Sequence, residues 1–376
     1  MADNLNEKQG LDDCTDVQAV VSAFENFHNS LELSEDDLSI LSSKTQESFE
    51  DVKFDLLPSF EDKEVFDDIS GESDIIKSTD DPLTLPFTLS EEDEINFDQN
   101  PEIVNPILFR ILPDESLWLL DHHEETLFRF YHYKGKELIH SFTIPRGTEK
   151  FCIGYPGGIL IDEENNIYAL DVEQQTVHKF SGEGEYDTNF HDQLSRQNVL
   201  GNSRDFDIIE NERLLLISDF VRGSVRKISL DGRDNGELRF REETSGFSLE
   251  CVTGVASGKN NRFYVIDPIQ KVIVDFDLEG NLGDVLPMEP RSQMEMPFCS
   301  QLQMDKNGYL FLVDYETQEI HAYNALGQLK GVFCTGPRSI LPDIRLGFFD
   351  VPREGRLYFL NRLTRHIHCL QYHFPE

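Results

Sequence analysis

Short hydrophobic runs that end in a polar residue recur along most of the chain. The run YLFLVD at residues 309–314 ends in an aspartate, and six residues after that aspartate Ile320 belongs to a second apolar stretch. Self-similarity at a period of this length is typical of propellers and solenoids. Spaced 47 to 50 residues apart, the residues that end these runs are Asp121, Asp171, Asp219, Asp267, Asp314 and Asn361.

The repeated unit is built from strands. Its runs are short and rich in Val, Ile, Tyr and Phe, and turn sequences such as ENN at 164–166 and KNG at 306–308 separate them. These features predict strands joined by tight turns. Six units of four antiparallel strands predict an all-β protein, a six-bladed β-propeller. In the fifth unit we expect strands at 300–304, 309–314, 319–323 and 328–333.

The residue that ends each second strand, called the marker below, has a structural explanation. A short carboxylate there accepts hydrogen bonds from the backbone of the turn that follows. Because the acid stands in the same frame in the repeats, a turn cap explains it better than a ring of catalytic acids. Glycines that permit the next turn follow at 135, 182, 232, 280 and 327.

The pattern resembles the NHL-repeat family and its six-bladed relatives. The resemblance covers residues 106–373 and rests on runs such as NIYALD at 166–171, each followed by V-x-K-F or I-x-A-Y. Two departures stand out: the repeats are somewhat long, which suggests long loops on one face, and Asn361 replaces the aspartate in the last unit. Asparagine can cap the same turn.

The last unit ends at QYHFPE, soon after its third strand. An open strand edge is an aggregation liability, so a segment before the first unit is expected to supply the missing outer strand. The best candidate is LTLPFTL at 83–89, where Pro86 is tolerable because the strand is outermost. The propeller is therefore expected to span 83–376.

Residues 1–82 are expected to form an acidic, mostly disordered arm. The chain carries a net charge of −38, and residues 1–100 contain 28 acidic but 5 basic residues. Thr15 and Gln18 form a capping box for a short helix. Residues 47–69 mix acids with Phe and Leu, which is typical both of binding motifs and of solubilising tails.

Composition argues against several function classes. A strongly acidic chain repels phosphates, so nucleic acid and anionic membranes are not expected partners. No apolar run reaches the roughly 18 residues of a membrane span. The N-terminus lacks a secretory leader and the six cysteines lack CxxC spacing, which predicts reduced thiols and a cytoplasmic location.

Arginines recur on one face of the predicted propeller, where the second-to-third-strand turns and the connections between blades lie. We call it the loop face. Arginine binds carboxylates and phosphates well, so a protein or peptide partner is expected there. The candidate partner-binding residues are Arg146, Arg196, Arg204, Arg222, Arg291, Arg338, Arg345 and Arg362, with Arg365 beside them.

Metal ligands and nucleophiles have weaker support. The histidines at 122–123 and the pair His366 and His368 fall in blades that are neighbours in a closed ring, but no Cys or Asp completes a convincing ligand set. Cys251 and Cys299 hold nearly equivalent positions without a local histidine base, so buried thiols are expected. We expect neither a metal nor a cofactor.

Two functions remain as hypotheses. One is a non-catalytic scaffold that binds a protein or peptide through the loop face, with the acidic arm as a second interaction element. The other is a channel-centred, metal-dependent hydrolase or lyase, although the first inner strand, ILFRIL at 107–112, lacks the acidic motif of gluconolactonase-type relatives. RNA binding, as in some NHL propellers, conflicts with the acidic body.

Overall fold

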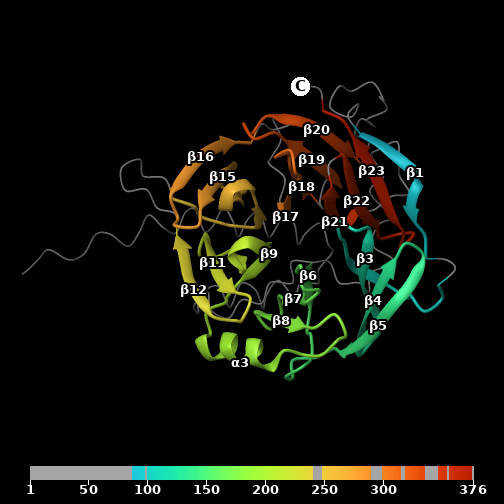
Figure 1. The fold of residues 1–376 in the computed structure, drawn as a ribbon. Helices are drawn as coiled ribbons and strands as arrows, with labels where there is room; N and C mark the ends of the chain where they lie inside the picture. The colour runs from blue at the N-terminus through green and yellow to red at the C-terminus, as the bar shows by residue number, and fades with distance from the viewer. Residues whose placement is uncertain are drawn as a thin grey trace, which may run out of the picture. The chain divides into compact units, whose positions relative to one another are not determined.

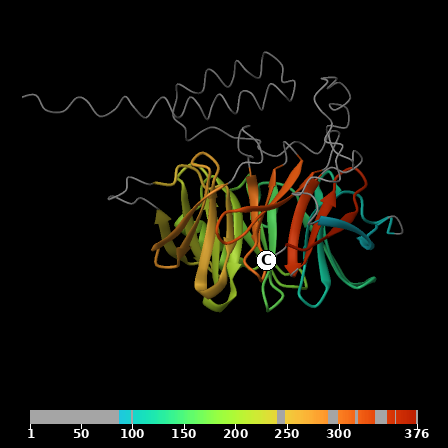
Figure 2. The ribbon, with the colours of Figure 1, turned by 90° about the horizontal axis from the view of Figure 1, so that it is seen from above.

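The structure is a computed structural model, and it describes residues 87–97, 100–239, 248–288, 299–314, 318–334, 346–353 and 355–374. Residues 1–82, with the expected helix after Thr15 and the 47–69 segment, lie outside the described part. Six antiparallel sheets surround a common axis, which makes the chain a six-bladed β-propeller (Figure 1). Figure 2 shows the same blades from the side.

The strands of each blade follow one another from the central axis outward. Blade 1 contains β2 (Pro106–Ile111), β3 (Ser116–Glu124), β4 (Leu127–Lys134) and β5 (Glu137–Pro145). Blade 2 contains β6 (Pro156–Ile161), β7 (Ile167–Asp171) and β8 (Thr176–Phe180). Blade 3 contains β9 (Ser203–Ile209), β10 (Leu214–Asp219), β11 (Ser224–Ser229) and β12 (Asp234–Arg239).

The other three blades have the same inner-to-outer order. Blade 4 contains β13 (Gly254–Ser257), β14 (Arg262–Asp267), β15 (Val272–Asp277) and β16 (Leu282–Pro287). Blade 5 contains β17 (Cys299–Met304), β18 (Leu310–Asp314), β19 (Glu319–Tyr323) and β20 (Leu329–Cys334), each within one residue of its predicted bounds. Blade 6 contains β21 (Leu346–Arg353), β22 (Arg356–Asn361), β23 (Ile367–Tyr372) and, outermost, β1 (Phe87–Ile95).

The repeated apolar positions form the core. The residues nine positions after the markers, on the third strands, are all at most 2% exposed. Full burial of one such side chain contributes about 1.5–3 kcal/mol, so the repeat places a comparable contribution in every blade. These residues are Phe130, Phe180, Ile228, Phe276, Tyr323 and Leu370.

In the described part of the chain, the markers of blades 2, 3, 4 and 6 cap the turn that follows them, as the sequence predicts. The marker of blade 1, Asp121, accepts instead from the amides of Val104 and Asn105, on the segment that leads into β2. Asp267 accepts hydrogen bonds from the amides of Ile269 and Gln270, both at 3.0 Å, in the turn after β14. It also accepts from the amides of Glu250 (2.7 Å) and Cys251 (3.2 Å), on the segment that leads into β13. The carboxylate therefore ties the turn to the incoming connection, a second task that the sequence did not suggest.

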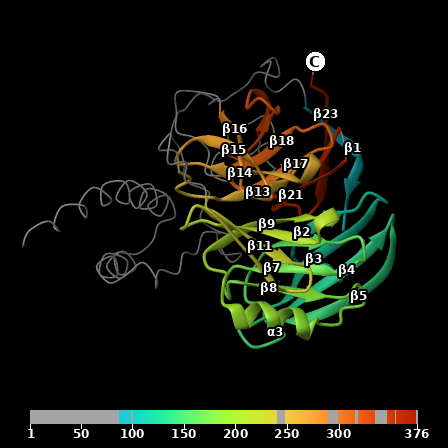
Figure 3. The ribbon, with the colours of Figure 1, turned by 60° about the vertical axis from the view of Figure 1, so that its left-hand side comes forward.

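Blade 2 departs from the predicted four strands. Its sheet has three, and helix α3 (Thr188–Gln197) lies along the outer side of β8 (Figures 1 and 3). Asp187 caps the helix by accepting from the Phe190 amide at 3.0 Å. Helix α3 lies in the connection that leads from blade 2 to blade 3. No helix in the described ranges is long and apolar enough to cross a membrane.

Blade 6 obtains its fourth strand from the N-terminal side of the propeller. β1 pairs antiparallel with β23, from Phe87 opposite Tyr372 to Ile95 opposite Ile367, with an irregularity after Ser90 (Figures 1 and 3). The strand overlaps the expected segment at 87–89 and continues six residues further. Residues 83–86 lie outside the described ranges.

Candidate functional site

Polar side chains on the inner strands bridge neighbouring blades. Arg110 on β2 donates from Nε to the Ile159 carbonyl of β6 at 2.8 Å, and from Nη1 to Asp350 Oδ1 of β21 at 2.7 Å. Asp350 also accepts from the Ile111 amide at 2.7 Å. Burial raises the pKa of Asp350, and Arg110 opposes that rise. One arginine thus joins blades 6, 1 and 2.

Two acids on β9 bridge blades elsewhere around the axis. Asp205 accepts from the amides of Val255 (3.1 Å) and Leu302 (3.2 Å), on the inner strands of blades 4 and 5. Asp207 accepts from the amide (2.6 Å) and the hydroxyl (2.7 Å) of Ser257. Burial raises the pKa of Asp205 to about 8, and the hydrogen bonds from Val255 and Leu302 oppose that rise.

Two glutamines complete the bridging on blade 5. Gln301 and Gln303 each donate from Nε2 to the Phe349 carbonyl, at 3.0 and 2.9 Å. Gln303 Oε1 accepts from the Val351 amide at 2.8 Å. These inner-strand side chains bond to neighbouring blades, an arrangement that holds the ring together. Within the described ranges, no group of three or more His, Cys, Asp and Glu side chains could hold a metal ion.

The two groups of candidate metal histidines have different structural contacts. His366 Nδ1 lies 2.8 Å from Glu94 Oε1 on β1, and His368 Nδ1 lies 3.9 Å from the other oxygen of Glu94. His122 packs against Phe128, with ring centroids 5.2 Å apart. The sequence analysis did not select Glu94, because it expected the closing strand at 83–89 and the strand observed is Phe87–Ile95.

Cys251 is 2% exposed, and burial raises the pKa of its thiol. A thiolate, which is the nucleophilic form, is therefore disfavoured at this position. The expectation of a buried thiol is confirmed for Cys251. The side chain of Cys299 lies outside the described part of the chain.

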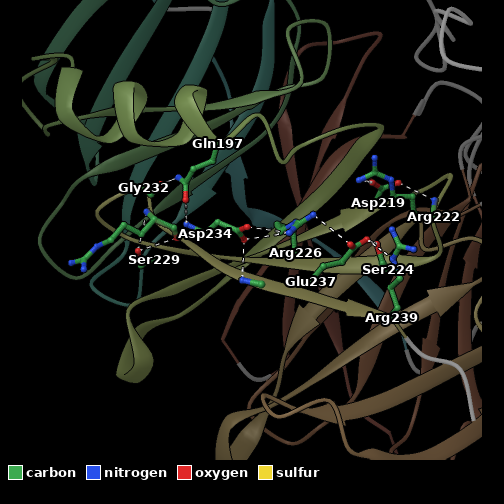
Figure 4. A network of polar contacts seen from close by, with 12 residues as sticks. Gln197, Asp219, Arg222, Ser224, Arg226, Ser229, Gly232, Asp234, Glu237 and Arg239 are labelled. Carbon is green, nitrogen blue, oxygen red and sulfur yellow. Dashed lines mark hydrogen bonds and ion pairs between the residues drawn. The ribbon is translucent and has the colours of Figure 1, made fainter.

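Five of the eight candidate arginines fall within the described ranges. Arg146 is exposed, with Nη1 3.4 Å from His122 Nε2. Arg222 is exposed in the turn after β10, with Nη1 3.9 Å from Asp219 Oδ2 (Figure 4). Arg362 follows the marker of blade 6 and is partly buried.

The other two described candidates are not in loops. Arg196 is exposed in the last turn of α3. Arg204 lies within β9, with its guanidinium carbon 5.8 Å from the centre of the Phe220 ring. The three remaining candidates, which lie outside the described ranges, are Arg291, Arg338 and Arg345.

Two arginines on the outer strands of blade 3 were not selected by the sequence analysis. Arg226 on β11 contacts Asp234 (3.1 Å) and Glu237 (3.4 Å) of β12, and Arg239 contacts Glu237 at 3.0 Å (Figure 4). Arg226 and Glu237 are opposite each other in the register of the two strands. Arg226 thus serves a cross-strand ion pair.

Exposed aliphatic side chains recur on the loop face. Val221, Ile269 and Leu363 stand two residues after the markers of blades 3, 4 and 6, and are 44%, 40% and 57% exposed. Exposed cations accompany them: Arg222 follows Val221, and Lys271 lies two residues after Ile269. We call Val221, Ile269 and Leu363 the turn triad. Large aliphatic side chains are unusual at the tip of a tight turn, where polar residues and glycine predominate.

The sequence analysis overlooked two groups of residues, the turn triad and the polar residues that bridge the inner strands. Both groups do leave a signal in the sequence. Aligning the six units on their markers places the turn triad in one column, and it places Arg110, Gln303 and Asp350 in another, eleven residues before the marker. What the alignment lacks is exposure for the first column and the bonding partner for the second.

Comparisons with known proteins support the fold. No protein-family model and no curated protein matches the chain. A streptogramin B lyase structure is 12% identical with a TM-score of 0.52, covering 78% of this chain and 100% of that one. Catalytically inactive virginiamycin B lyase from Staphylococcus aureus with quinupristin is 10% identical with a TM-score of 0.49, covering 76% and 100%.

A nidogen/laminin complex gives 16% identity and a TM-score of 0.47, covering 64% of this chain and 83% of that one. At these identities the likeness concerns the fold alone. The chain is a six-bladed β-propeller, and its resemblance to NHL repeats stays a prediction.

Proposed function

We propose that this protein is a non-catalytic, NHL-like propeller that binds a protein or peptide partner through its loop face. The observation that carries the proposal is the turn triad: three blades present a large aliphatic side chain at the same exposed turn position. Exposed apolar groups beside arginine are typical of the energetic centre of protein interfaces.

Phe151 adds to this face. It is 47% exposed on the connection into β6, and its φ of 74° lies in the left-handed region that bulky residues avoid. Its ring meets Tyr186 edge-on, with centroids 4.8 Å apart. Holding an aromatic residue exposed in this conformation costs stability, and such costs tend to occur at binding sites.

The inner strands support the scaffold over the enzyme. A channel-centred hydrolase needs acids, amides or histidines that converge on a substrate. Here Asp207, Asp350 and Gln303 bond to residues of neighbouring blades instead. The lyase among the solved structures of like fold brings no residue to this chain, because its identity is only 12%.

The test is proximity crosslinking and mass spectrometry with the full chain expressed in its own host. The test variant changes the turn triad: Val221→Ser, Ile269→Ser and Leu363→Ser together. A matched control is Leu326→Ser, because Leu326 is 68% exposed in the turn between β19 and β20, on the opposite face.

The triple variant should lose at least roughly tenfold in crosslinked partner, because tenfold corresponds to about 1.4 kcal/mol and three aliphatic contacts exceed that. The Leu326 variant should retain the partner, and both variants should keep the wild-type melting temperature. Equal recovery of the partner by all three proteins would overturn the proposal.

A further inference from the structure

A histidine stands seven residues after the marker in blades 2, 5 and 6, and in blades 2 and 6 it contacts that marker. In blade 5 this histidine is His321, whose Nε2 lies 2.8 Å from Glu319 Oε2. In blade 2, His178 Nε2 lies 3.3 Å from Asp171 Oδ2, and His178 Nδ1 lies 3.2 Å from the Tyr186 hydroxyl. A carboxylate can only accept, so the proton of the neutral ring is on Nε2. Nδ1 then accepts a hydrogen bond from Tyr186.

In blade 6 the marker is Asn361, and its amide orientation is fixed. Its Oδ1 accepts from the Leu363 amide at 3.1 Å, which turns Nδ2 toward His368. The distance from Asn361 Nδ2 to His368 Nε2 is 3.3 Å. An amide nitrogen can only donate, so His368 Nε2 accepts and the ring proton is on Nδ1. The tautomer is the reverse of that in blade 2.

The protonated nitrogen of His368 faces the closing strand. Nδ1 lies 3.9 Å from Glu94 Oε2, while the other oxygen of Glu94 lies 2.8 Å from His366 Nδ1. Glu94 lies within the irregular stretch of β1, between the pairs Ser90–Cys369 and Ile95–Ile367, where the regular ladder with β23 is interrupted. Side-chain contacts therefore hold the strand where backbone pairing is weakest.

The opposite end of β1 is held by aromatic packing. The Phe87 ring lies 6.1 Å from Phe333, 6.4 Å from Tyr372 and 5.7 Å from Phe374, between centroids. Together these contacts define a strand of particular sequence: an aromatic residue at its start and a glutamate seven positions later.

We propose that the edge of blade 6 is a strand-recognition site whose occupant is residues 87–95 of this chain, and that Asn361 determines its specificity by fixing the proton of His368 on Nδ1. An aspartate at this position, as in the other blades, would draw the proton to Nε2. The Nδ1 lone pair would then face the Glu94 carboxylate. The exception in the repeat is thus the residue that lets blade 6 accept an acidic strand.

Hydrogen exchange of the full chain tests the proposal by reporting protection factors for 87–95. Asn361→Asp should lower protection at pH 8 by roughly tenfold, the equivalent of about 1.4 kcal/mol. Adding Glu94→Gln to Asn361→Asp should restore most of the protection, because the Nδ1 lone pair of His368 then no longer faces a carboxylate. Asn324→Asp is the matched control, since Asn324 caps the exposed turn after β19 and its variant should leave β1 unchanged.

The Asn361→Asp variant should also gain a pH dependence. The groups that face His368 are Glu94, His366, Asn361 and the neutral Phe359 ring, 5.4 Å away. Between two carboxylates the pKa of His368 would rise, and the doubly protonated ring would donate to both. Protection should therefore return at about pH 5.5 and be lost as pH increases through the raised pKa.

Equal loss of protection with and without Glu94→Gln would overturn the proposal, since Asn361 would then act only as a turn cap. Unchanged protection in Asn361→Asp at pH 8 would overturn it as well. If the Asn361→Asp variant does not fold, hydrogen exchange of the Glu94→Gln single variant tests the proposal. This variant should weaken protection of 87–95 a few-fold, and an unchanged value would contradict a role for Glu94.

Discussion

Blades 2 and 6 solve the same structural problem in different ways. In neither blade does the repeat itself supply a fourth strand, and in both blades another element covers the outer edge of the third strand. Blade 2 uses α3, which follows β8 directly in the chain, whereas blade 6 uses β1, which comes from the other end of the propeller. A local cover closes a short loop, but β1 closes nearly the whole ring, at a higher cost in chain entropy.

The comparison shows that the repeat position seven residues after the marker is compatible with two kinds of outer cover, helix α3 in blade 2 and strand β1 in blade 6. His178 and His368 occupy this position, and the marker beside each decides which nitrogen carries the proton. Aspartate in blade 2 turns the accepting nitrogen toward the hydroxyl of Tyr186. Asparagine in blade 6 turns the donating nitrogen toward the carboxylate of Glu94.

The largest expected effect comes from removing the distant cover. Deleting residues 80–92 removes Phe87 and most of β1, and the loss of one buried phenylalanine alone costs about 3–5 kcal/mol. The melting temperature should fall by roughly 10 °C or more, measured by calorimetry. A deletion of equal length at 30–42 is the control and should have little effect. An unchanged melting temperature after the first deletion would contradict closure by β1.

Asp171→Asn makes the reverse exchange in blade 2 and should be the next most harmful. Asp171 accepts from the amides of Gly154 (2.6 Å) and Gln174 (2.9 Å) as well as from His178. An asparagine must place its own donors against some of these donors. Leaving buried groups unsatisfied should lower the free energy of unfolding by about 2–4 kcal/mol, measured by urea denaturation. A cost below about 0.5 kcal/mol would mean that the cap contributes little.

The difference in stability between wild type and the Asp171→Asn variant should depend on pH. Burial acts to raise the pKa of Asp171, but hydrogen bonds from His178, Gln174 and Gly154 outweigh it and lower the pKa below its ordinary value. A lowered pKa adds stability that is present above the unfolded value and is lost as pH falls through the folded one. The stability gap between wild type and Asp171→Asn should therefore narrow below about pH 4. A constant gap from pH 6 to pH 3 would show that the charge is not what matters.

The smallest expected effect concerns the attachment of α3 to blade 3. Gln197 donates to the Gly232 carbonyl at 2.9 Å and accepts from the Asp234 amide at 2.8 Å (Figure 4). Gln197→Ala should cost about 1–2 kcal/mol and raise hydrogen exchange at 232–234. The exposed neighbour Arg196 provides the control, because Arg196→Ala should change neither quantity.

Much of the fold could be predicted because every repeat states the same pattern. The strands of blade 5 and the capping role of the markers followed from periodicity and turn chemistry. The two covers could not be placed in the same way. Only Phe190 and Leu194 of α3 are buried, which leaves a weak helical signal. The closing strand FTLSEEDEI is dense in acids, so its strand propensity is low and pairing with β23 decides its position.

The candidate site was harder to predict than the fold. Arginines were chosen by residue type, but Arg204 lies within a strand, and Arg226, which was not chosen, sits in an ion pair set by strand register. Bridges such as Arg110 to Asp350 join residues 240 positions apart. A short stretch of sequence shows neither the bonding partner of a polar side chain nor its exposure. Both determine whether that residue supports the ring or faces a ligand.

The most direct test of this account is hydrogen exchange of the unmodified full chain, resolved at β1 and β23. Closure by β1 predicts that the amides within 87–90 that face β23 are protected, because these residues pair in register with 369–372. Exchange at 87–90 at the rate of an unstructured peptide, with β23 itself protected, would show that blade 6 is not covered by this strand and would contradict the account.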